Sequence, residues 1–260
     1  MEEFRGYKIK PIERLGEGAF GYVEKVELYN LDGGLCGIYA RKVLAPQGNI
    51  LSSISIEEIK RRFIREVTYQ SYCSHANIIY IYLFNRYAEN PYFVMELGEC
   101  DLEEEINAGQ LTYIDKVRIV LMVLNAAKKI HDKGYLHRDI KPKNILKFGT
   151  GLYKLTDFGL VKDIDGERNT TALTAIGCMM GTRKYMAPEI MIDAEYSAQT
   201  DIYALGIVFR EMKIDNALLS VIIEKCVKRD KVDRYETIDE ILRDIDRAGI
   251  AIMPEMEVIL

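Results

Sequence analysis

The stretch HRDIKPKN at residues 137–144 contains three side chains that suit one kind of chemistry. The carboxylate of Asp139 can accept a hydrogen bond from a hydroxyl group and orient it toward a phosphate. The ammonium group of Lys141 can hold a phosphoryl group, and the amide oxygen of Asn144 can coordinate a divalent ion. Taken singly, each residue has an ordinary structural explanation, such as a turn for Asp139. The interpretation therefore depends on what accompanies this stretch.

A second motif, DFG at residues 157–159, follows thirteen residues after Asn144. The Asp157 carboxylate can hold the metal ion that bridges two phosphates. With HRDIKPKN at this distance from DFG, the chain resembles the eukaryotic-type (Hanks-type) serine/threonine protein kinases. The resemblance extends over nearly the whole chain. It implies ATP and Mg²⁺ as cofactors, with Mn²⁺ as an alternative ion, and proteins as substrates.

Length and composition fit a soluble globular protein. The chain has 260 residues, 48% of them hydrophobic, and can bury a substantial core. It has no apolar run long enough to span a membrane, and residues 1–5 do not resemble a signal peptide. The net charge of −5 gives no support to nucleic-acid binding. We therefore expect a cytoplasmic protein with no membrane or nucleic-acid contacts.

Cysteine usage agrees with that location. The chain has five cysteines, an odd number, and no CxxC pair, which argues for free thiols in a reducing compartment and against disulfides or a zinc site.

The glycine-rich segment at residues 16–23, GEGAFGYV, lies between two predicted strands. Gly16, Gly18 and Gly21 would let a hairpin fold closely over phosphates, with backbone N–H groups near the oxygens. The same glycines occur in dinucleotide-binding folds, but those place a helix after the third glycine. Here residues 22–29 alternate like a strand and end in Asp-Gly-Gly, a hairpin signal. The pattern favours the kinase interpretation.

A third strand at residues 38–43 carries Lys42, which the resemblance places on the α- and β-phosphates. Ala40 and Val23 would then cover the adenine ring. The resemblance gives Lys42 a partner in Glu66, which lies nine residues before the segment HANII. Residues 45–55 form a longer connection to which we assign no chemistry.

A helix is predicted at residues 56–72, with Ser53 or Ser55 as its N-cap. Its basic residues form either a solvated face or a site for a phosphate on the activation loop. Gln70 stands where the family usually has an apolar residue, so we expect a looser position for this helix. The basic residues are Lys60, Arg61, Arg62 and Arg65.

Two further strands at residues 79–86 and 91–96 lead to the expected nucleotide pocket. By resemblance, Met95 stands at the back of the adenine pocket, Glu96 and Leu97 belong to the hinge whose backbone bonds adenine, and Leu146 forms the floor. Asp101 could accept a hydrogen bond from a ribose hydroxyl or cap the short helix that follows it. The sequence leaves these two roles open.

An amphipathic helix is predicted at residues 112–133 and a hairpin at residues 144–156. The helix has core-spaced residues Val117, Val120, Leu121, Leu124 and Ile130.

Residues 157–189 resemble an activation segment that ends in GTRKYMAPE. Thr182, together with Lys141, is the pattern of serine/threonine rather than tyrosine kinases. Arg138, preceding Asp139, suggests control by a phosphate on this loop, because a buried guanidinium needs an anion. Many relatives have an acceptor threonine where this chain has Cys178. We therefore expect autophosphorylation first at Thr174, with Thr170 and Thr171 as alternates.

The C-terminal third contains three further expectations. Asp201 would bond the backbone of the catalytic loop, and Arg234 would pair with Glu189. A helix beginning near Asp201 would end near residue 212, and a second would occupy residues 217–228, capped by Asp215 or Asn216. The four residues between them cannot hold the extra helix that similar kinases have there. The second helix has Leu218, Val221, Ile222 and Val227 at what we take to be core spacing.

Taken together, the sequence predicts one α+β protein-kinase domain over residues 1–260. Its N-lobe, residues 1–97, is a small five-stranded sheet with one main helix. Its C-lobe, residues 98–260, is mostly helical and lacks the extra helix. The predicted function is transfer of the γ-phosphoryl group of MgATP to serine or threonine of proteins, with an adaptor as a further partner. The alternatives are a pseudokinase scaffold, which would have lost Lys42, Asp139 or Asp157, and a small-molecule kinase, which usually lacks the GTRKYMAPE segment.

Overall fold

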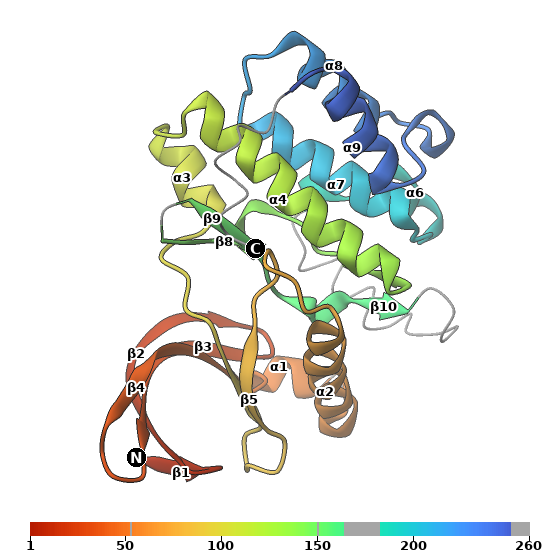
Figure 1. The fold of residues 1–260 in the computed structure, drawn as a ribbon. Helices are drawn as coiled ribbons and strands as arrows, with labels where there is room; N and C mark the ends of the chain where they lie inside the picture. The colour runs from red at the N-terminus through yellow and green to blue at the C-terminus, as the bar shows by residue number, and fades with distance from the viewer. Residues whose placement is uncertain (53, 150, 164–182, 251–260) are drawn as a thin grey trace. The chain divides into compact units, whose positions relative to one another are not determined.

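The computed structural model describes residues 1–52, 54–149, 151–163 and 183–250, with the activation-loop threonines and the last ten residues outside this set. Backbone contacts divide the chain into two compact units. The N-terminal unit comprises Met1–Ser74 and Ile79–Gly98, and the C-terminal unit comprises His75–Ile78 and Glu99–Leu260. Residues 75–78, which the sequence assigned to the N-lobe, therefore group with the C-terminal unit. Figure 1 shows the elements of both units.

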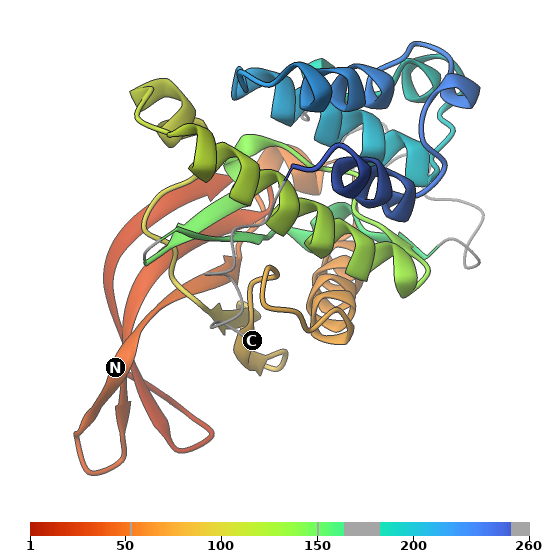
Figure 2. The same cartoon turned by 45° about the horizontal axis from the view of Figure 1, so that its top comes forward.

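The N-terminal unit is built on an antiparallel sheet with strand order β1-β2-β3-β4-β6-β5. The predicted five strands are present, and a sixth, β1, pairs with β2 at the edge of the sheet. Figure 2 shows β2, β3 and β4 as long, curved neighbouring strands. One face buries a core around Ile9, Val26 and Val94, all 0% exposed. The strands are β1 (Glu2–Phe4), β2 (Tyr7–Gly18), β3 (Gly21–Asn30), β4 (Leu35–Leu44), β5 (Ile81–Asn85) and β6 (Tyr92–Met95).

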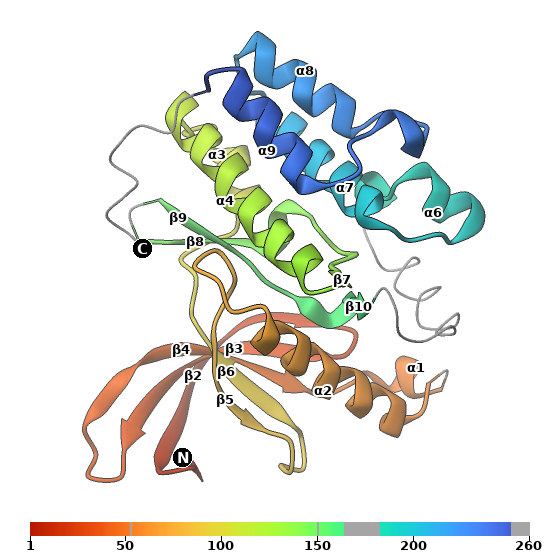
Figure 3. The same cartoon turned by 45° about the vertical axis from the view of Figure 1, so that its right-hand side comes forward.

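The main helix of this unit, α2 (Ile56–Tyr72), has the predicted bounds. Ser55 caps it by accepting a hydrogen bond from the Glu58 N–H, so of the two predicted caps Ser55 is confirmed. The short helix α1 (Gly48–Leu51) precedes it within the connection at residues 45–55 (Figure 3).

The buried face of α2 includes one polar residue whose partner the sequence does not reveal. The Gln70 side chain is 3% exposed, and its Nε2 donates to the carbonyl of Ile79 at 2.9 Å. A buried amide with a satisfied hydrogen bond ties the helix to the chain ahead of β5. We expected Gln70 to loosen the helix, and the observed bond acts in the opposite direction.

The C-terminal unit packs around α4 (Tyr113–Asp132), whose predicted core positions are all buried. Thr112 and Asp115 form a reciprocal capping box at its start. In Figure 3, α9 lies beside α4, and Lys128 on α4 forms an ion pair with Asp239 on α9. The other α-helices among the described residues of this unit are α3 (Leu102–Ala108), α6 (Pro188–Asp193), α7 (Ala198–Glu211), α8 (Ala217–Cys226) and α9 (Ile238–Arg247).

Two small ribbons complete this unit. The strands β8 (Ile145–Phe148) and β9 (Leu152–Leu155) form the predicted hairpin, and β7 (Tyr135–Leu136) pairs with β10 (Lys162–Asp163). Among the described residues, no helix is long and apolar enough to cross a bilayer.

The connection from α7 to α8 is as short as the sequence predicted. Helix α7 ends at Glu211 and α8 begins at Ala217, with no helix between them. Asn216, and not Asp215, caps α8 by accepting from the Leu219 N–H at 2.9 Å. The two helices meet closely at Gly206, where a side chain would lie 2.7 Å from Cβ of Cys226. Glycine at this position therefore permits the packing of α7 on α8.

The predicted core face of α8 is wrong in part. Leu218 and Val221 are 56% and 69% exposed, whereas Ile222 is buried as expected. The residues that face α7 and α9 are Leu219, Ile222, Ile223 and Cys226. Because almost every residue from 217 to 223 is apolar, helical periodicity alone does not distinguish the two faces.

A buried ion pair connects the segment before α9 to α6. The Arg234 side chain is 0% exposed, and its two terminal nitrogens bond both carboxylate oxygens of Glu189 at 2.7 and 2.8 Å. Its Nε donates to the carbonyl of Lys228, and NH2 also donates to that of Arg229. This confirms the predicted pair.

We expect Arg234→Ala to lower the free energy of unfolding by about 3–5 kcal/mol, because it leaves the Glu189 carboxylate without its buried counter-ion. Urea denaturation would measure the change. Arg229→Ala, at an exposed position in the same segment, is the matched control and should change stability by less than about 0.5 kcal/mol. Equal midpoints for the two variants would contradict a structural role for the pair.

Candidate active site

In the N-terminal unit, the glycine-rich segment forms the end of the β2–β3 hairpin. Gly16 pairs with Val23, and Gly18 pairs with Gly21, leaving Ala19 and Phe20 at the tip. A side chain at Gly21 would lie 2.0 Å from the carbonyl oxygen of Val43, so only glycine allows β3 to approach β4 here. The strand predicted after the third glycine is present, which agrees with the kinase interpretation and not with a dinucleotide-binding fold.

Lys42 and Glu66 form the predicted ion pair within this unit. The Nζ of Lys42 lies 2.5 Å from Oε1 of Glu66, and their side chains are 25% and 5% exposed. Lys42 stands opposite Val23 in the β3–β4 register. A buried carboxylate of this kind fixes the lysine ammonium in one position. The strand and the main helix are thereby joined at the residue that the sequence assigns to phosphate binding.

The remaining predicted nucleotide residues of this unit lie on β4, β6 and the segment after β6. Ala40 pairs with Met95, and both are buried. The N–H of Glu96 donates to the carbonyl of Tyr80, and its carboxylate accepts from the Tyr80 N–H. Leu97 follows and is half-buried. Two hydrogen bonds to Tyr80 therefore hold Glu96 in place directly after Met95.

In the C-terminal unit, Asp139, Lys141 and Asn144 converge at one point. Nζ of Lys141 lies 2.7 Å from Oδ2 of Asp139, and Nδ2 of Asn144 donates to the same oxygen at 3.0 Å and to the Asp139 carbonyl at 2.8 Å. Burial and the nearby Asp157 carboxylate raise the pKa of Asp139, and Lys141 opposes them. Oδ1 of Asp139 has no partner among the described residues and can accept a hydroxyl proton.

The arrangement fits a divalent cation held by Asn144 and Asp157. Both donor contacts of Asn144 use its nitrogen, so its amide oxygen is left as a metal ligand. Asp157 adopts a left-handed backbone with φ of 65°, and its Oδ1 accepts from the Gly159 N–H at 3.4 Å. No cluster of three or more His, Cys, Asp or Glu side chains suited to a metal occurs in the described ranges. Two oxygen ligands supplemented by phosphates are the usual arrangement for Mg²⁺, and Mn²⁺ accepts the same donors.

Asp101 occupies the N-cap of α3. Its Oδ1 accepts from the Glu104 N–H at 2.9 Å, so the capping alternative is confirmed. Asp101 also forms an isolated β-bridge with Leu146 on β8. The bridge places these two predicted nucleotide residues next to one another. A ribose contact by Asp101 remains a prediction.

A fully buried carboxylate accepts hydrogen bonds from the backbone of the candidate catalytic loop, residues 137–144. Asp201 on α7 accepts from the backbone N–H groups of His137 and Arg138 at 2.8 and 2.9 Å and contacts Nε2 of His131 at 2.9 Å. Burial alone would raise the pKa of Asp201, but these partners hold it below its ordinary value. Asp201 was predicted, whereas His131 was not. No spacing in the sequence links residues 131 and 201.

His137 packs against the DFG motif. Its ring meets the ring of Phe158 edge to face, with centroids 5.3 Å apart, and its Nε2 lies 3.1 Å from the carbonyl oxygen of Thr156. Burial lowers the pKa of His137, so the imidazole is neutral at pH 7 and belongs to the core. The two motifs at residues 137–144 and 157–159 are therefore in direct contact.

Arg138 has a left-handed backbone, with φ of 68°, and its guanidinium carbon lies 3.7 Å from the centre of the Tyr196 ring. The ring is a contact that the sequence did not predict. Binding of a loop phosphate by Arg138 stays a prediction, because the proposed acceptors lie outside the described residues. Those positions are Thr170, Thr171 and Thr174, and Thr182, the residue typical of serine/threonine kinases, also lies outside the described residues.

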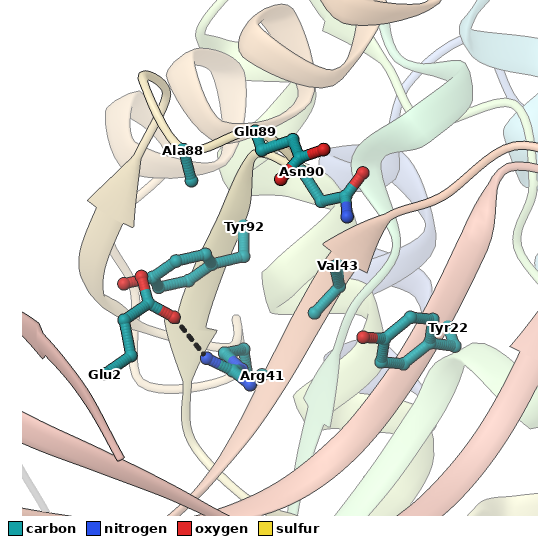
Figure 4. A pocket seen from close by; sticks show the side chains of 8 residues that line it. All are labelled: Glu2, Tyr22, Arg41, Val43, Ala88, Glu89, Asn90 and Tyr92. Carbon is teal, nitrogen blue, oxygen red and sulfur yellow. Dashed lines mark hydrogen bonds and ion pairs between the residues drawn. The ribbon is translucent and has the colours of Figure 1, made fainter.

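A pocket of about 270 Å³ lies on the face of the N-terminal sheet opposite to the one that carries the Lys42 side chain. Arg41, adjacent to Lys42 on β4, borders it, and successive side chains of a strand point to opposite faces. Arg41 forms an ion pair with Glu2 from β1 at 3.0 Å, drawn as a dashed line in Figure 4, and also pairs with Glu24. None of the predicted nucleotide residues lines this pocket.

Comparison with known families agrees with this geometry. The model of the protein kinase domain matches residues 9–255. The chain belongs to the protein kinase family, as the sequence predicted.

Several curated relatives carry protein-kinase names, and the first two below are named serine/threonine-protein kinases. The probable serine/threonine-protein kinase CPE1738 of Clostridium perfringens is 28% identical over 93% of this chain and 38% of its own length. The serine/threonine-protein kinase PknD of Protochlamydia amoebophila is 28% identical over 73% of the chain and 25% of its own length. Mitogen-activated protein kinase 15 of Xenopus laevis is 34% identical over 82% of the chain and 35% of its own length. The chain thus spans well under half the length of these relatives.

Proposed function

We propose that the chain is one protein-kinase domain, residues 1–260, that transfers the γ-phosphoryl group of ATP to serine or threonine of protein substrates. The observation that carries this proposal is the convergence of Asp139, Lys141 and Asn144, with bonds of 2.7 to 3.0 Å. Serine/threonine specificity is supported by Lys141 and Thr182 in the sequence and by the names of the relatives.

Each residue has a defined task in this reaction. The free Asp139 oxygen orients the substrate hydroxyl in line with the phosphate, and Lys141 offsets the charge that develops on the transferred group. Lys42, positioned by Glu66, holds the α- and β-phosphates under the glycine hairpin. Mg²⁺, bound by Asn144 and Asp157, would supply the charge neutralisation between the phosphates.

The alternatives have less support. A pseudokinase would lack one of Lys42, Asp139 or Asp157, and all three are present. The Lys42–Glu66 and Asp139–Lys141 pairs are also formed. A kinase for small molecules would usually lack the segment GTRKYMAPE, which includes the Glu189 that pairs with Arg234.

We expect Asp139→Asn and Lys42→Ala each to lower the phosphorylation rate by several orders of magnitude while the protein stays folded. Catalysis here consists of positioning and charge stabilisation, with no covalent step on the protein. Incorporation of labelled phosphate from ATP measures the rate, and thermal unfolding measures the fold.

Asp215→Asn and Lys133→Ala make the same chemical changes at exposed positions and should leave the rate unchanged. Phosphate incorporation by Asp139→Asn at close to the wild-type level would disprove the proposal.

We further propose that a phosphate on the activation segment regulates the enzyme, with Thr174 as its first acceptor and Thr170 or Thr171 as alternates. Such a phosphate carries about −1.5 to −2 charges and would pair with Arg138. The support is in the chain itself, where Cys178 stands at the usual acceptor position.

Purified active protein should therefore gain phosphate at Thr174 on incubation with ATP, as read by intact-mass and peptide spectra. Asp139→Asn serves as the control and should gain none, because the modification is its own reaction. Thr174→Ala should lower activity, whereas Thr174→Ser should retain it. An active enzyme with no phosphate in this segment would refute the regulatory part and leave the catalytic part intact.

Substrate choice is proposed to depend on the activation segment or on an adaptor. The support is the direct connection from α7 to α8 and the exposed Leu218 and Val221 side chains on α8. We expect short peptides around the acceptor site to have a kcat/KM at least about tenfold below that of the intact target, because they lose any second contact. Equal values for peptide and protein would exclude the adaptor.

A cytoplasmic location is part of the proposal and is supported by the cysteines. Four of the five, Cys36, Cys73, Cys100 and Cys226, are free thiols in the structure. Free thiols of this kind persist in a reducing compartment.

A further inference from the structure

The tip of the glycine hairpin is bonded to the connection at residues 45–55, for which the sequence suggested no role. The N–H of Ala45 donates to the carbonyl of Phe20, and the N–H of Gln47 donates to that of Ala19, both at 3.0 Å. The first bond follows the β3–β4 register, in which Gly21 stands opposite Leu44, and the second is shifted from that register by one residue. The hairpin tip is therefore hydrogen-bonded to the backbone of the segment that directly follows β4.

The sequence of the connection suits this pairing. The two donors, Ala45 and Gln47, are alternate residues, whereas their acceptors, Phe20 and Ala19, are consecutive. Pro46, which has no N–H, occupies the position between them, where no donor is needed. A residue before proline favours extended backbone, which suits the position of Ala45 directly after β4.

The connection is itself anchored in the N-terminal unit. Helix α1 begins after Gln47, whose carbonyl accepts from the N–H groups of Ile50 and Leu51. Ile50 and Ile54 are 7% and 6% exposed. Backbone bonds and buried side chains thus hold residues 45–54 in place, and the hairpin tip is bonded to a fixed segment.

A second contact joins the tip to α2. The guanidinium carbon of Arg62 lies 5.1 Å from the centre of the Phe20 ring, within the range of a cation–π interaction. Arg62 precedes Glu66 by one helical turn, so the two side chains leave the same face of α2. One face of one helix therefore contacts both the hairpin tip and Lys42.

From these contacts we propose that residues 45–47 and Arg62 are positioning elements that hold the glycine hairpin over the nucleotide phosphates and couple it to α2. This inference rests on the proposed kinase function. The strap, meaning the backbone of residues 45–47, fixes the tip before nucleotide binds. Because the hairpin tip is already ordered, nucleotide binding does not have to supply the free energy of ordering it, and the affinity for nucleotide is higher. A displacement of α2 that separates Glu66 from Lys42 also withdraws Arg62 from Phe20.

The strap can be tested by one substitution that removes only an N–H group. Gln47 has φ of −68°, which is the value that proline imposes, and its side chain makes no capping bond. Gln47→Pro deletes the bond to Ala19 without requiring a new backbone angle, and Gln47→Ala keeps the N–H and is the matched control. We expect Gln47→Pro to weaken MgADP binding by about three- to tenfold, the effect of one hydrogen bond, and Gln47→Ala to change it less than twofold. Isothermal titration of the full chain measures both.

The contact between Arg62 and Phe20 can be tested by changing the charge at position 62 and by combining substitutions at both positions. Arg62→Ala should raise KM for ATP by about two- to fivefold with little change in kcat, and Arg62→Lys should restore most of the loss, since an ammonium group also interacts with a ring face. Phe20→Leu should have an effect similar to that of Arg62→Ala, and the double variant should be no weaker than either single one. Additive effects in the double variant would contradict a direct contact between the two side chains.

Hydrogen exchange separates this inference from the proposed function. In the nucleotide-free wild type, the amides of Ala45 and Gln47 should be protected, and Gln47→Pro should accelerate exchange at residues 18–22 while Gln47→Ala should not. This result supports the strap whether or not the protein phosphorylates a substrate. Unprotected amides at Ala45 and Gln47, or equal MgADP affinity for Gln47→Pro and Gln47→Ala, would overturn the inference. Wild-type protein that binds no MgADP yet shows the protected amides would instead overturn the proposed function.

Discussion

The candidate catalytic loop depends on the buried carboxylate of Asp201. Two consecutive N–H groups, of His137 and Arg138, point at one side chain that is 1% exposed. Consecutive amides converge in this way only if the backbone turns sharply, and Arg138 accordingly has a left-handed φ of 68°. The energetic cost of that conformation is offset by charge-assisted hydrogen bonds in a region from which water is excluded. This backbone turn brings Asp139, Lys141 and Asn144 within hydrogen-bonding distance of one another.

Much of this arrangement could be predicted from the sequence, because it rests on local motifs. The bonds of Asp139, Lys141 and Asn144 span at most five residues, and the bounds of α2 follow from its cap and its apolar spacing. Two longer-range pairs, Lys42–Glu66 and Glu189–Arg234, were found because the family resemblance supplied their positions. Without that resemblance, neither pair has a signature in composition or spacing.

The features that were missed depend on packing between distant segments. The contact of His131 with Asp201 joins residues 70 positions apart, and Arg138 over Tyr196 is of the same kind. The exposed side of α8 was misassigned because Leu218, Leu219, Val221, Ile222 and Ile223 are all apolar, and only the neighbours of the helix decide which are buried. Gln70 was expected to loosen α2 because it is polar at a buried position. The sequence does not show that its side chain bonds the carbonyl of Ile79.

The ion pairs around Arg41 include a residue outside the segment that the family model matches. Arg41 has a side chain that is 9% exposed, and Glu2 provides one of its two carboxylate partners. The family match starts at residue 9, beyond β1. A shortened chain that followed the family boundary would keep every predicted nucleotide residue but would lose Glu2 and leave the Arg41 charge with Glu24 alone. The family match therefore leaves out a residue that takes part in the charge balance of a buried guanidinium in the N-terminal unit.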